Sequence, residues 1–178
     1  MWEFVEGVRG VADACHAITL KDHPNDPTPI IAGNVSFYNE SKSGPIPPSP
    51  IVSCLGRFKN VNKAVPAHFQ NNDSVILLIG ERKNELGGSV YYSLKNELGA
   101  NVPKPNFEEV KNQIFALTDC IDSGLVLSCH DIADGGIASA LAEMTFTNSI
   151  GCNVNIESDL SPDKILFSET GGFILEVL

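Results

Sequence analysis

The sequence predicts an α+β protein in which helices cover a mixed β-sheet, and three observations support this class. Apolar residues recur at spacings of three and four in residues 2–18 and 107–121, as they do along one face of a helix. Residues 75–79 form the short apolar run VILLI, which is typical of a buried strand. The stretch SCHDIADGGIASALAEM follows another apolar run and indicates a strand, a tight loop and a helix in succession.

The first 60 residues are predicted to hold one helix and two strands. The helix starts almost without a lead-in, so we expect the natural chain to be longer. The loop LKDHPNDPTP separates the helix from a strand in PIIAGNVSF. A second loop, YNESKSGPIPPSP, is dense in Ser, Gly and Pro and precedes a strand in PIVSCLGRF. We place a domain boundary here, between residues 1–60 and residues 61–178.

The second segment is predicted to form the larger domain. Its segment ERKNELGGSVYYSLKNELG mixes charges with a Gly-Gly pair and is expected to be a loop. Another loop, LFSETGG, precedes the last strand. The expected elements are, in order, a strand at 75–79, a helix at 107–121, a strand at 125–127, a helix after Gly136, and strands at 153–156 and 173–177.

Composition excludes several classes of function. The 178 residues carry a formal net charge of -10, spread along the chain, which argues against binding nucleic acid or an anionic membrane surface. No apolar run approaches the roughly 20 residues that a membrane-spanning helix needs. The N-terminus carries early acidic residues and does not resemble a secretory signal. Five dispersed cysteines indicate reduced thiols, so we expect a cytoplasmic protein.

The loop HDIADGG has two interpretations. Asp and Gly dominate turns, and Asp134 is a good candidate to cap the following helix. Alternatively, the free N–H groups of Gly135 and Gly136 at a helix start would attract an anion such as a phosphate. Cys129 beside His130 does not make a catalytic pair, because neighbours on a strand point to opposite faces.

The segment AGNVSFYN also has two interpretations. An amide oxygen is a suitable ligand for Mg²⁺, so Asn34 could hold a metal ion, or it could satisfy its own backbone in a turn. Ser36 could donate to a phosphate or a sugar, or it could cap a loop. The segment lacks the spacing of a Walker loop or of a dinucleotide-binding fingerprint.

Six ordered stretches resemble the phosphoribosylformylglycinamidine synthase family, of the AIR-synthase-like superfamily. They cover nearly the whole chain and follow the order of the second, C-terminal half of that enzyme. The stretches are GVRGVADACHA, GNVSFYNES, IPPSPIVSCLG, LLIGERKNELGGSVYY, SCHDIADGGIASALAEM and LFSETGGFILEV. Two departures are Ala32, where the family often has a second Gly, and LKDHPNDPTP, which is longer than the usual connection.

The resemblance implies a fold, a reaction and a set of ligands. Residues 1–60 would be the tail of an N-terminal-type domain, and residues 61–178 most of a C-terminal-type domain. The family makes formylglycinamidine ribonucleotide from formylglycinamide ribonucleotide in purine biosynthesis, with ATP, Mg²⁺ and glutamine-derived ammonia. Carried over to this sequence, Gly33 would contact ATP, Asn34 would bind Mg²⁺ and Ser36 would bind the substrate. The implied partners are the remaining domains of the synthase and a glutamine amidotransferase component.

The resemblance also implies that this chain has no catalytic residue of its own. The family's catalytic histidine and metal-binding carboxylates lie in the first half, which has no counterpart here. LFSETGG resembles a degenerate copy of a substrate loop, so we assign no ligand to Glu169. We therefore expect an inactive piece of an ATP-dependent ligase whose first 60 residues pack incompletely. The alternative hypothesis is a non-catalytic binding or assembly module with the same fold.

Overall fold

The computed structural model describes residues 2–35 and 38–178. The chain divides into two compact units, Met1–Arg57 and Phe58–Leu178. Both units combine helices with short or long antiparallel strands, so the predicted α+β class is confirmed. The predicted domain boundary, after residue 60, lies close to the division between the units. That the first unit is the tail of an N-terminal-type domain stays a prediction.

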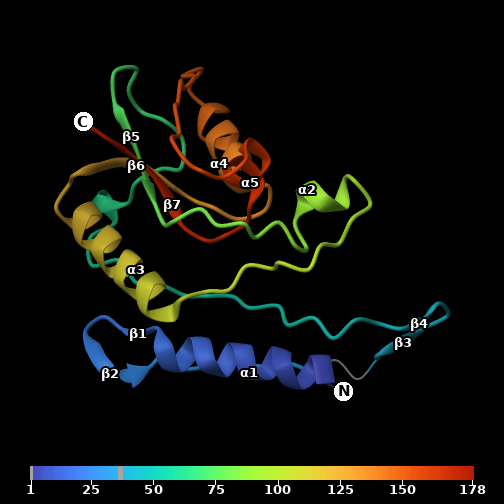
Figure 1. Cartoon of the computed structure of the whole chain (residues 1–178). Coiled ribbons are helices and arrows are strands. Elements are labelled where there is room, and N and C mark those ends of the chain that lie inside the picture. Colours follow the sequence, from blue (N-terminus) through green and yellow to red (C-terminus); the bar gives the residue numbers. More distant parts are fainter. Residues whose placement is uncertain (1, 36–37) are drawn as a thin grey trace. The chain divides into compact units, whose positions relative to one another are not determined.

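The first unit is one helix with two small hairpins (Figure 1). Helix α1 spans Trp2–Ala17, as the apolar spacing predicts. The hairpins pair β1 (Thr19–Leu20) with β2 (His23–Pro27) and β3 (Glu40–Ser41) with β4 (Gly44–Pro45). Among residues 2–35 and 38–57 no side chain is buried. The expectation that this part of the chain packs incompletely is confirmed.

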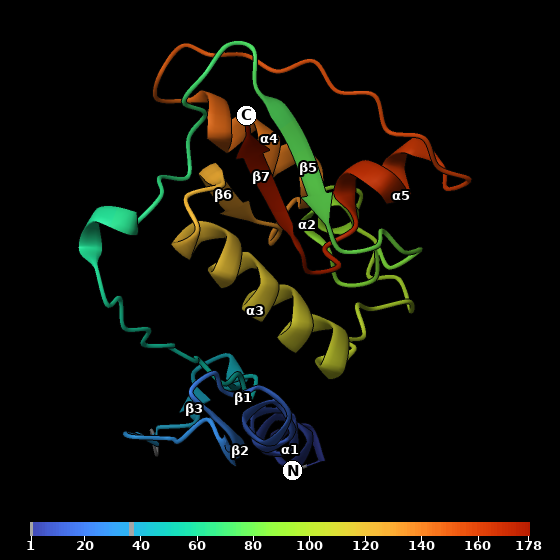
Figure 2. The same ribbon diagram turned by 90° about the vertical axis from the view of Figure 1, so that its left-hand side faces the viewer.

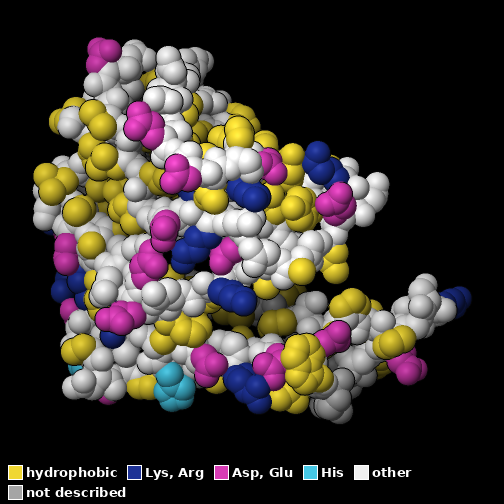
Figure 3. Space-filling model, viewed as in Figure 1, with side chains coloured by type: hydrophobic (Ala, Val, Ile, Leu, Met, Phe, Trp, Pro, Cys, Tyr) yellow, Lys and Arg dark blue, Asp and Glu magenta, His cyan; other side chains and the backbone are white. Residues whose placement is uncertain are grey.

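The surface of α1 mixes all side-chain types. In the space-filling view, hydrophobic, acidic and basic side chains all reach the surface over this helix (Figure 3). Trp2 is 74% exposed and Val8 is 57% exposed, although an amphipathic helix normally buries such residues. The helix therefore has an apolar stripe that its own unit does not cover.

The two strands predicted in the first unit are not formed. Residues 50–57, and the described residues of 29–37, carry no strand. The proline-containing loops form the hairpins instead, with register partners only a few residues apart. A lone strand leaves its backbone N–H and C=O groups unpaired, so it does not form unless a partner strand is present.

The second unit is built on a three-stranded sheet with the order β5-β7-β6. The strands are β5 (Val75–Ile79), β6 (Val126–Asp131) and β7 (Phe173–Val177). Both ladders are antiparallel, so among the described strands there is no parallel pair of the kind a mixed sheet contains. Strands form at 75–79 and 173–177, as predicted. The expectation that the first of them is buried is wrong, because β5 lies at the sheet edge with Val75, Leu77 and Leu78 exposed. Strand β6 runs further than predicted, and the strand expected at 153–156 is not formed.

Helices lie on both faces of this sheet (Figures 1 and 2). Helix α3 packs on one face and α4 on the other, and the two core clusters of buried residues correspond to these faces. The helices are α2 (Val90–Ser93), α3 (Phe107–Asp122), α4 (Gly136–Thr145) and α5 (Pro162–Phe167), with a 3₁₀ turn at Val61–Lys63. Helices α3 and α4 were predicted from their apolar spacing, whereas the shorter helices were not.

Strand alternation sorts the residues of β7 between the two faces. Leu175 joins the cluster with Leu117 of α3, whereas Ile174 joins the cluster with Ile137 of α4. Successive side chains of a strand point to opposite faces, so Glu176 shares the α4 face with Ile174. A fully buried glutamate therefore stands in the central strand.

Candidate functional site

Three loops of the second unit meet at the start of α4. They are residues 80–90, which contain NELGGS, residues 132–135 of the HDIADGG stretch, and residues 168–172, which contain SETGG. We call them the three motif loops. The Glu169 Oε1 atom accepts a hydrogen bond from the N–H of Val90 at 2.8 Å and one from the N–H of Gly135 at 2.9 Å. One carboxylate oxygen thus joins all three loops.

Two buried charged side chains, Arg82 and Glu85, fix the third loop from the other side. The Arg82 guanidinium donates to the carbonyl oxygens of Thr170 and of Gly171, the latter at 2.7 Å. The Thr170 hydroxyl donates to Glu85 at 2.8 Å. Burial lowers the pKa of Arg82 below its ordinary value, and the Glu85 carboxylate opposes that shift. Arg82 and Glu85 are therefore engaged in holding the third loop, Arg82 through two backbone carbonyls and Glu85 through the Thr170 hydroxyl.

Glycine is required at Gly136 by both conformation and space. Its φ is +66°, and a β-carbon there would lie 2.6 Å from the Leu166 carbonyl oxygen and 2.8 Å from that of Ser168. L-residues rarely adopt this φ, and backbone atoms give way poorly. The tight packing places the start of α4 against the end of α5.

The structure changes the interpretation of the HDIADGG stretch. Asp134 is exposed, and the residue that precedes α4 is Gly135, which makes no side-chain cap. The predicted Asp134 cap is thus wrong. The N–H of Gly135 is bonded to Glu169, and the N–H of Gly136 donates to the carbonyl of Ala133 at 3.1 Å. That Gly135 and Gly136 bind an external anion stays a prediction.

The buried carboxylate of Glu176 is held by four donors. It accepts from the N–H groups of Gln70 and Asn71 and from the hydroxyls of Ser74 and Ser128, at 2.7–2.8 Å. Burial raises the pKa of Glu176, but the hydrogen bonds outweigh it and hold the pKa below the ordinary value of 4.5. The carboxylate attaches the segment of residues 70–74 to the sheet, and this arrangement is structural.

Cys129 and His130 do not form a nucleophile–base pair. Burial, with the Asp131 charge as a smaller cause, raises the pKa of the Cys129 thiol to about 11. The His130 Nε2 atom lies 3.0 Å from a Glu143 carboxylate oxygen instead. A thiol with a raised pKa is a poor nucleophile at neutral pH, in line with the expectation from strand geometry.

The predicted ligand residues of the first unit lie on an exposed segment. Gly33 and Asn34 are both exposed, and Ser36 lies outside the described residues. A β-carbon at Gly33 would meet no atom within 4 Å. Neither space nor a positive φ requires glycine at this position, so the fold of the unit does not explain it. The roles of Gly33, Asn34 and Ser36 stay predictions.

The described residues do not by themselves make a metal site. Among them no three His, Cys, Asp or Glu side chains are grouped so as to hold a metal ion. Mg²⁺ prefers several oxygen ligands in near-octahedral geometry and gives up its water reluctantly. The single amide oxygen of Asn34 does not fit Mg²⁺ unless further ligands come from elsewhere.

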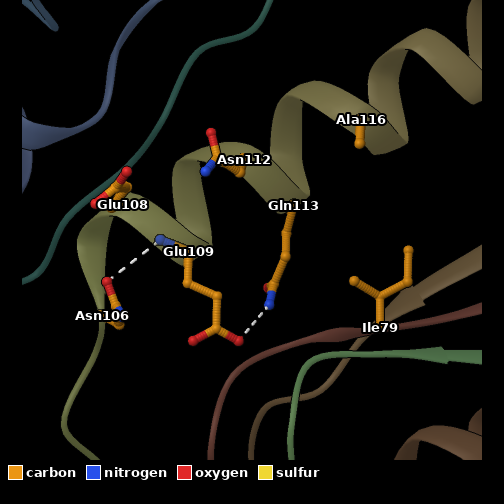
Figure 4. A pocket seen from close by; sticks show the side chains of 7 residues that line it. All are labelled: Ile79, Asn106, Glu108, Glu109, Asn112, Gln113 and Ala116. Carbon is orange, nitrogen blue, oxygen red and sulfur yellow. Dashed lines mark hydrogen bonds between the residues drawn. The ribbon is translucent and has the colours of Figure 1, made fainter.

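Two open cavities mark the surface of the second unit. The first, of about 540 Å³, lies between the N-terminal half of α3 and Ile79 of β5 (Figure 4). Glu109 and Gln113 point toward the strand side and are bonded to each other at 2.9 Å (Figure 4). The amide of Gln113 therefore already satisfies part of the Glu109 carboxylate. Glu108, the other carboxylate of the lining, is exposed, and we assign no ligand to this cavity.

The second cavity, also of about 540 Å³, lies on the α4 face beside β5. Ile76 and Leu78 of β5, Ile137 and Leu141 of α4 and the segment of residues 150–157 line it. The predicted strand at 153–156 falls on this segment. The segment forms no strand, and among the described strands the partner of β5 is β7.

Sequence reasoning missed Glu169, Arg82 and Glu85 as the side chains that organise the motif loops. The loops themselves stood out through their glycines. The partners lie far apart in the chain, and no local pattern joins Val90 or Gly135 to Glu169. A glutamate two residues before a Gly-Gly pair, in a loop close to a buried strand, is the one local signal.

Comparison with known proteins identifies the larger unit. The sequence profile of the family described as "AIR synthase related protein, C-terminal domain" matches residues 71–178. The chain belongs to this family. The matched range holds all three motif loops and every strand of the three-stranded sheet.

Relatives of known name match almost the whole chain. The phosphoribosylformylglycinamidine synthase subunit PurL of Methanothrix thermoacetophila is 42% identical over 99% of this chain, and that of Thermoplasma volcanium is 38% identical over 99%. The resemblance found in the sequence is confirmed. The chain spans only 23% and 22% of the length of these two relatives.

Solved structures support the fold. The structure titled "T. maritima PurL complexed with FGAR" is 18% identical, with a TM-score of 0.53, over 66% of this chain and 22% of that chain. "Structure of PurLQS from Thermotoga maritima" is 22% identical, with a TM-score of 0.52, over 66% and 20%. Among the described residues, no helix is both long and apolar enough to cross a membrane.

Proposed function

We propose that this chain works as part of a phosphoribosylformylglycinamidine synthase. That enzyme is an ATP- and glutamine-dependent ligase that converts formylglycinamide ribonucleotide to formylglycinamidine ribonucleotide. The observation that carries the proposal is the 42% identity, over 99% of the chain, to a subunit of that name. The cytoplasm, where purine nucleotides are made, is the proposed location.

The chain alone is proposed to be inactive, and its first unit to contribute ligand contacts to the assembled enzyme. Gly33 would contact ATP, Asn34 would supply one oxygen to Mg²⁺, and Ser36 would contact the substrate. The exposure of Gly33 and Asn34 supports this assignment, because a ligand can reach both. The donor set of the described residues supports the further proposal that carboxylates from the remaining domains complete the metal site.

The remaining domains of the synthase and a glutamine amidotransferase component are the proposed partners. Support comes from the first unit, where the apolar stripe of α1 is exposed and no described side chain is buried. Apolar area of this kind is typical of a surface that packs against another part of a protein.

A chimera tests the proposal. The segment of the Methanothrix thermoacetophila subunit that aligns with this chain is replaced by this chain, and turnover of formylglycinamide ribonucleotide is assayed with ATP, Mg²⁺ and an ammonia source. We expect the chimera to turn over substrate and the isolated chain to show none. A chimera that folds like the parent subunit and is inactive contradicts the proposal, as does turnover by the isolated chain.

The site assignment is tested within an active chimera. We expect Asn34→Ala to lower turnover at least tenfold and to raise the Mg²⁺ concentration needed for half-maximal rate. The matched control is Asn39→Ala, which removes an exposed amide from the same unit and should leave both values unchanged. Equal effects of the two substitutions contradict the role of Asn34.

A further inference from the structure

The Glu169 carboxylate bonds to two loops other than its own. Its Oε1 atom lies 2.8 Å from the N–H nitrogen of Val90 and 2.9 Å from that of Gly135. Val90 is the first residue of α2, and Gly135 directly precedes α4. Both N–H groups lie at helix starts, where no intrahelical acceptor exists and a negative charge is favourable.

The segment that carries Glu169 is anchored independently of this contact. Arg82 holds the carbonyls of Thr170 and Gly171, and Glu85 holds the Thr170 hydroxyl. On the other side of Glu169, the backbone of Ser168 packs against Gly136. Removal of the Glu169 carboxylate should therefore leave the segment in place and free only the two N–H groups.

We propose that Glu169 is a latch that couples the loop before α2 to the loop before α4. Because a single oxygen accepts both hydrogen bonds, an event that moves this oxygen releases Val90 and Gly135 together. Hydrogen bonds to a carboxylate are roughly twice as strong as those between neutral groups, so the coupling is stronger than an ordinary loop contact. The NELGGS and HDIADGG stretches thus open and close as one unit. This device is independent of the proposed ligase activity.

Native-state hydrogen exchange of the full chain, followed by NMR, tests the latch. In Glu169→Ala we expect the amides of Val90 and Gly135 to exchange faster by the same factor, on the order of tenfold. The amides of Gln70 and Asn71, which Glu176 holds, should keep their rates. Glu81→Ala is the control, because Glu81 is exposed in the neighbouring loop and the substitution removes the same charge.

A second variant keeps the test decisive if Glu169→Ala fails to fold. Glu169→Gln retains a carbonyl oxygen that can accept both bonds but lacks the charge. The exchange rates of the Val90 and Gly135 amides should therefore rise equally, and by a smaller factor than in Glu169→Ala. Acceleration of only one of the two amides, or of neither, in the variant that folds overturns the proposal. Equal acceleration in Glu81→Ala, or acceleration that also includes Gln70 and Asn71, overturns it as well.

Discussion

Apolar stretches form strands in the second unit of this chain but not in the first. Residues 75–79 and 173–177 are apolar runs that pair with each other, and residues 173–177, in the central strand, are covered by helices on both faces. The stretch PIVSCLGRF also contains several apolar residues, yet it forms no strand in the described structure, and Ile51 there is 96% exposed. An apolar pattern becomes a strand where a partner strand supplies hydrogen bonds, and β5 shows that this holds even where three of the five side chains stay exposed.

The largest expected effect is the loss of unfolding free energy when an apolar side chain is shortened, and it should differ between the two units. Ile174 is 1% exposed in the central strand, whereas Ile31 is 74% exposed in the first unit. We expect Ile174→Ala to lower the free energy of unfolding by about 2–5 kcal/mol, because it removes buried methyl groups and leaves a cavity. Ile31→Ala should change it by less than about 0.5 kcal/mol.

Urea unfolding followed by circular dichroism measures both values. A loss of similar size in the two variants would mean that the first unit has a core of its own. The comparison of the units would then fail.

The next effect contrasts two glycines. Gly136 has a φ of +66° and backbone atoms within 3 Å of its β-carbon position, whereas Gly33 has open space around it. We expect Gly136→Ala to cost about 2–3 kcal/mol of unfolding free energy, because strain and a backbone clash add. Gly33→Ala should be neutral or slightly stabilising in the isolated chain. Thermal unfolding of the two variants checks this, and equal melting temperatures would contradict it.

How far the sequence predicted the fold depended on where each element found its partners. The apolar spacing of residues 107–121 and the run VILLI predicted α3 and β5, because their partners are present in the second unit. The hairpin β1–β2 was missed, because its prolines indicated a loop and its pairing is local. The strand predicted at 153–156 is not formed, although its segment lines the same cavity as the edge strand β5, and we have no physical reason for this miss.

The candidate site was predictable in its loops and not in its contacts. Gly-Gly pairs in NELGGS and HDIADGG indicated a close backbone approach, and Gly136 has one. The sequence predicted that Asp134 caps the start of α4. In the structure, the carboxylate that accepts a hydrogen bond there, from the N–H of Gly135, is that of Glu169. Local capping rules favour the nearest carboxylate, whereas tertiary packing brought a distant one to the helix start.

A smaller effect concerns the loss of stability at low pH, which we trace to Glu176 of the second unit. The pKa of Glu176 is below 4.5 in the folded chain, because four hydrogen bonds outweigh the effect of burial. A depressed carboxylate pKa stabilises the fold above the ordinary value, and this contribution is lost as the pH falls below about 4.5 toward the folded pKa. Stability should therefore decrease in that window.

Unfolding experiments between pH 7 and pH 3 follow this change. Glu176→Gln should cost about 1–3 kcal/mol at neutral pH, because it leaves buried donors without an acceptor, and it should flatten the acid dependence. The control is Glu157→Gln, at an exposed position of the same unit. An unchanged acid slope in Glu176→Gln would show that other carboxylates cause the loss.

The smallest expected effect is nucleotide binding by the isolated chain. The Gly33–Ser36 segment belongs to the unit in which no described side chain is buried, and one loop offers few of the contacts that a nucleotide needs. Mg²⁺ dehydrates reluctantly, so the free energy gained from a single amide oxygen at Asn34 hardly exceeds the cost of the water that it displaces. Calorimetry of ADP with Mg²⁺ should show no binding or millimolar binding, which corresponds to about 4 kcal/mol at most. Micromolar binding that disappears in Gly33→Val and Asn34→Ala would mean that this first unit carries a complete site despite its open packing.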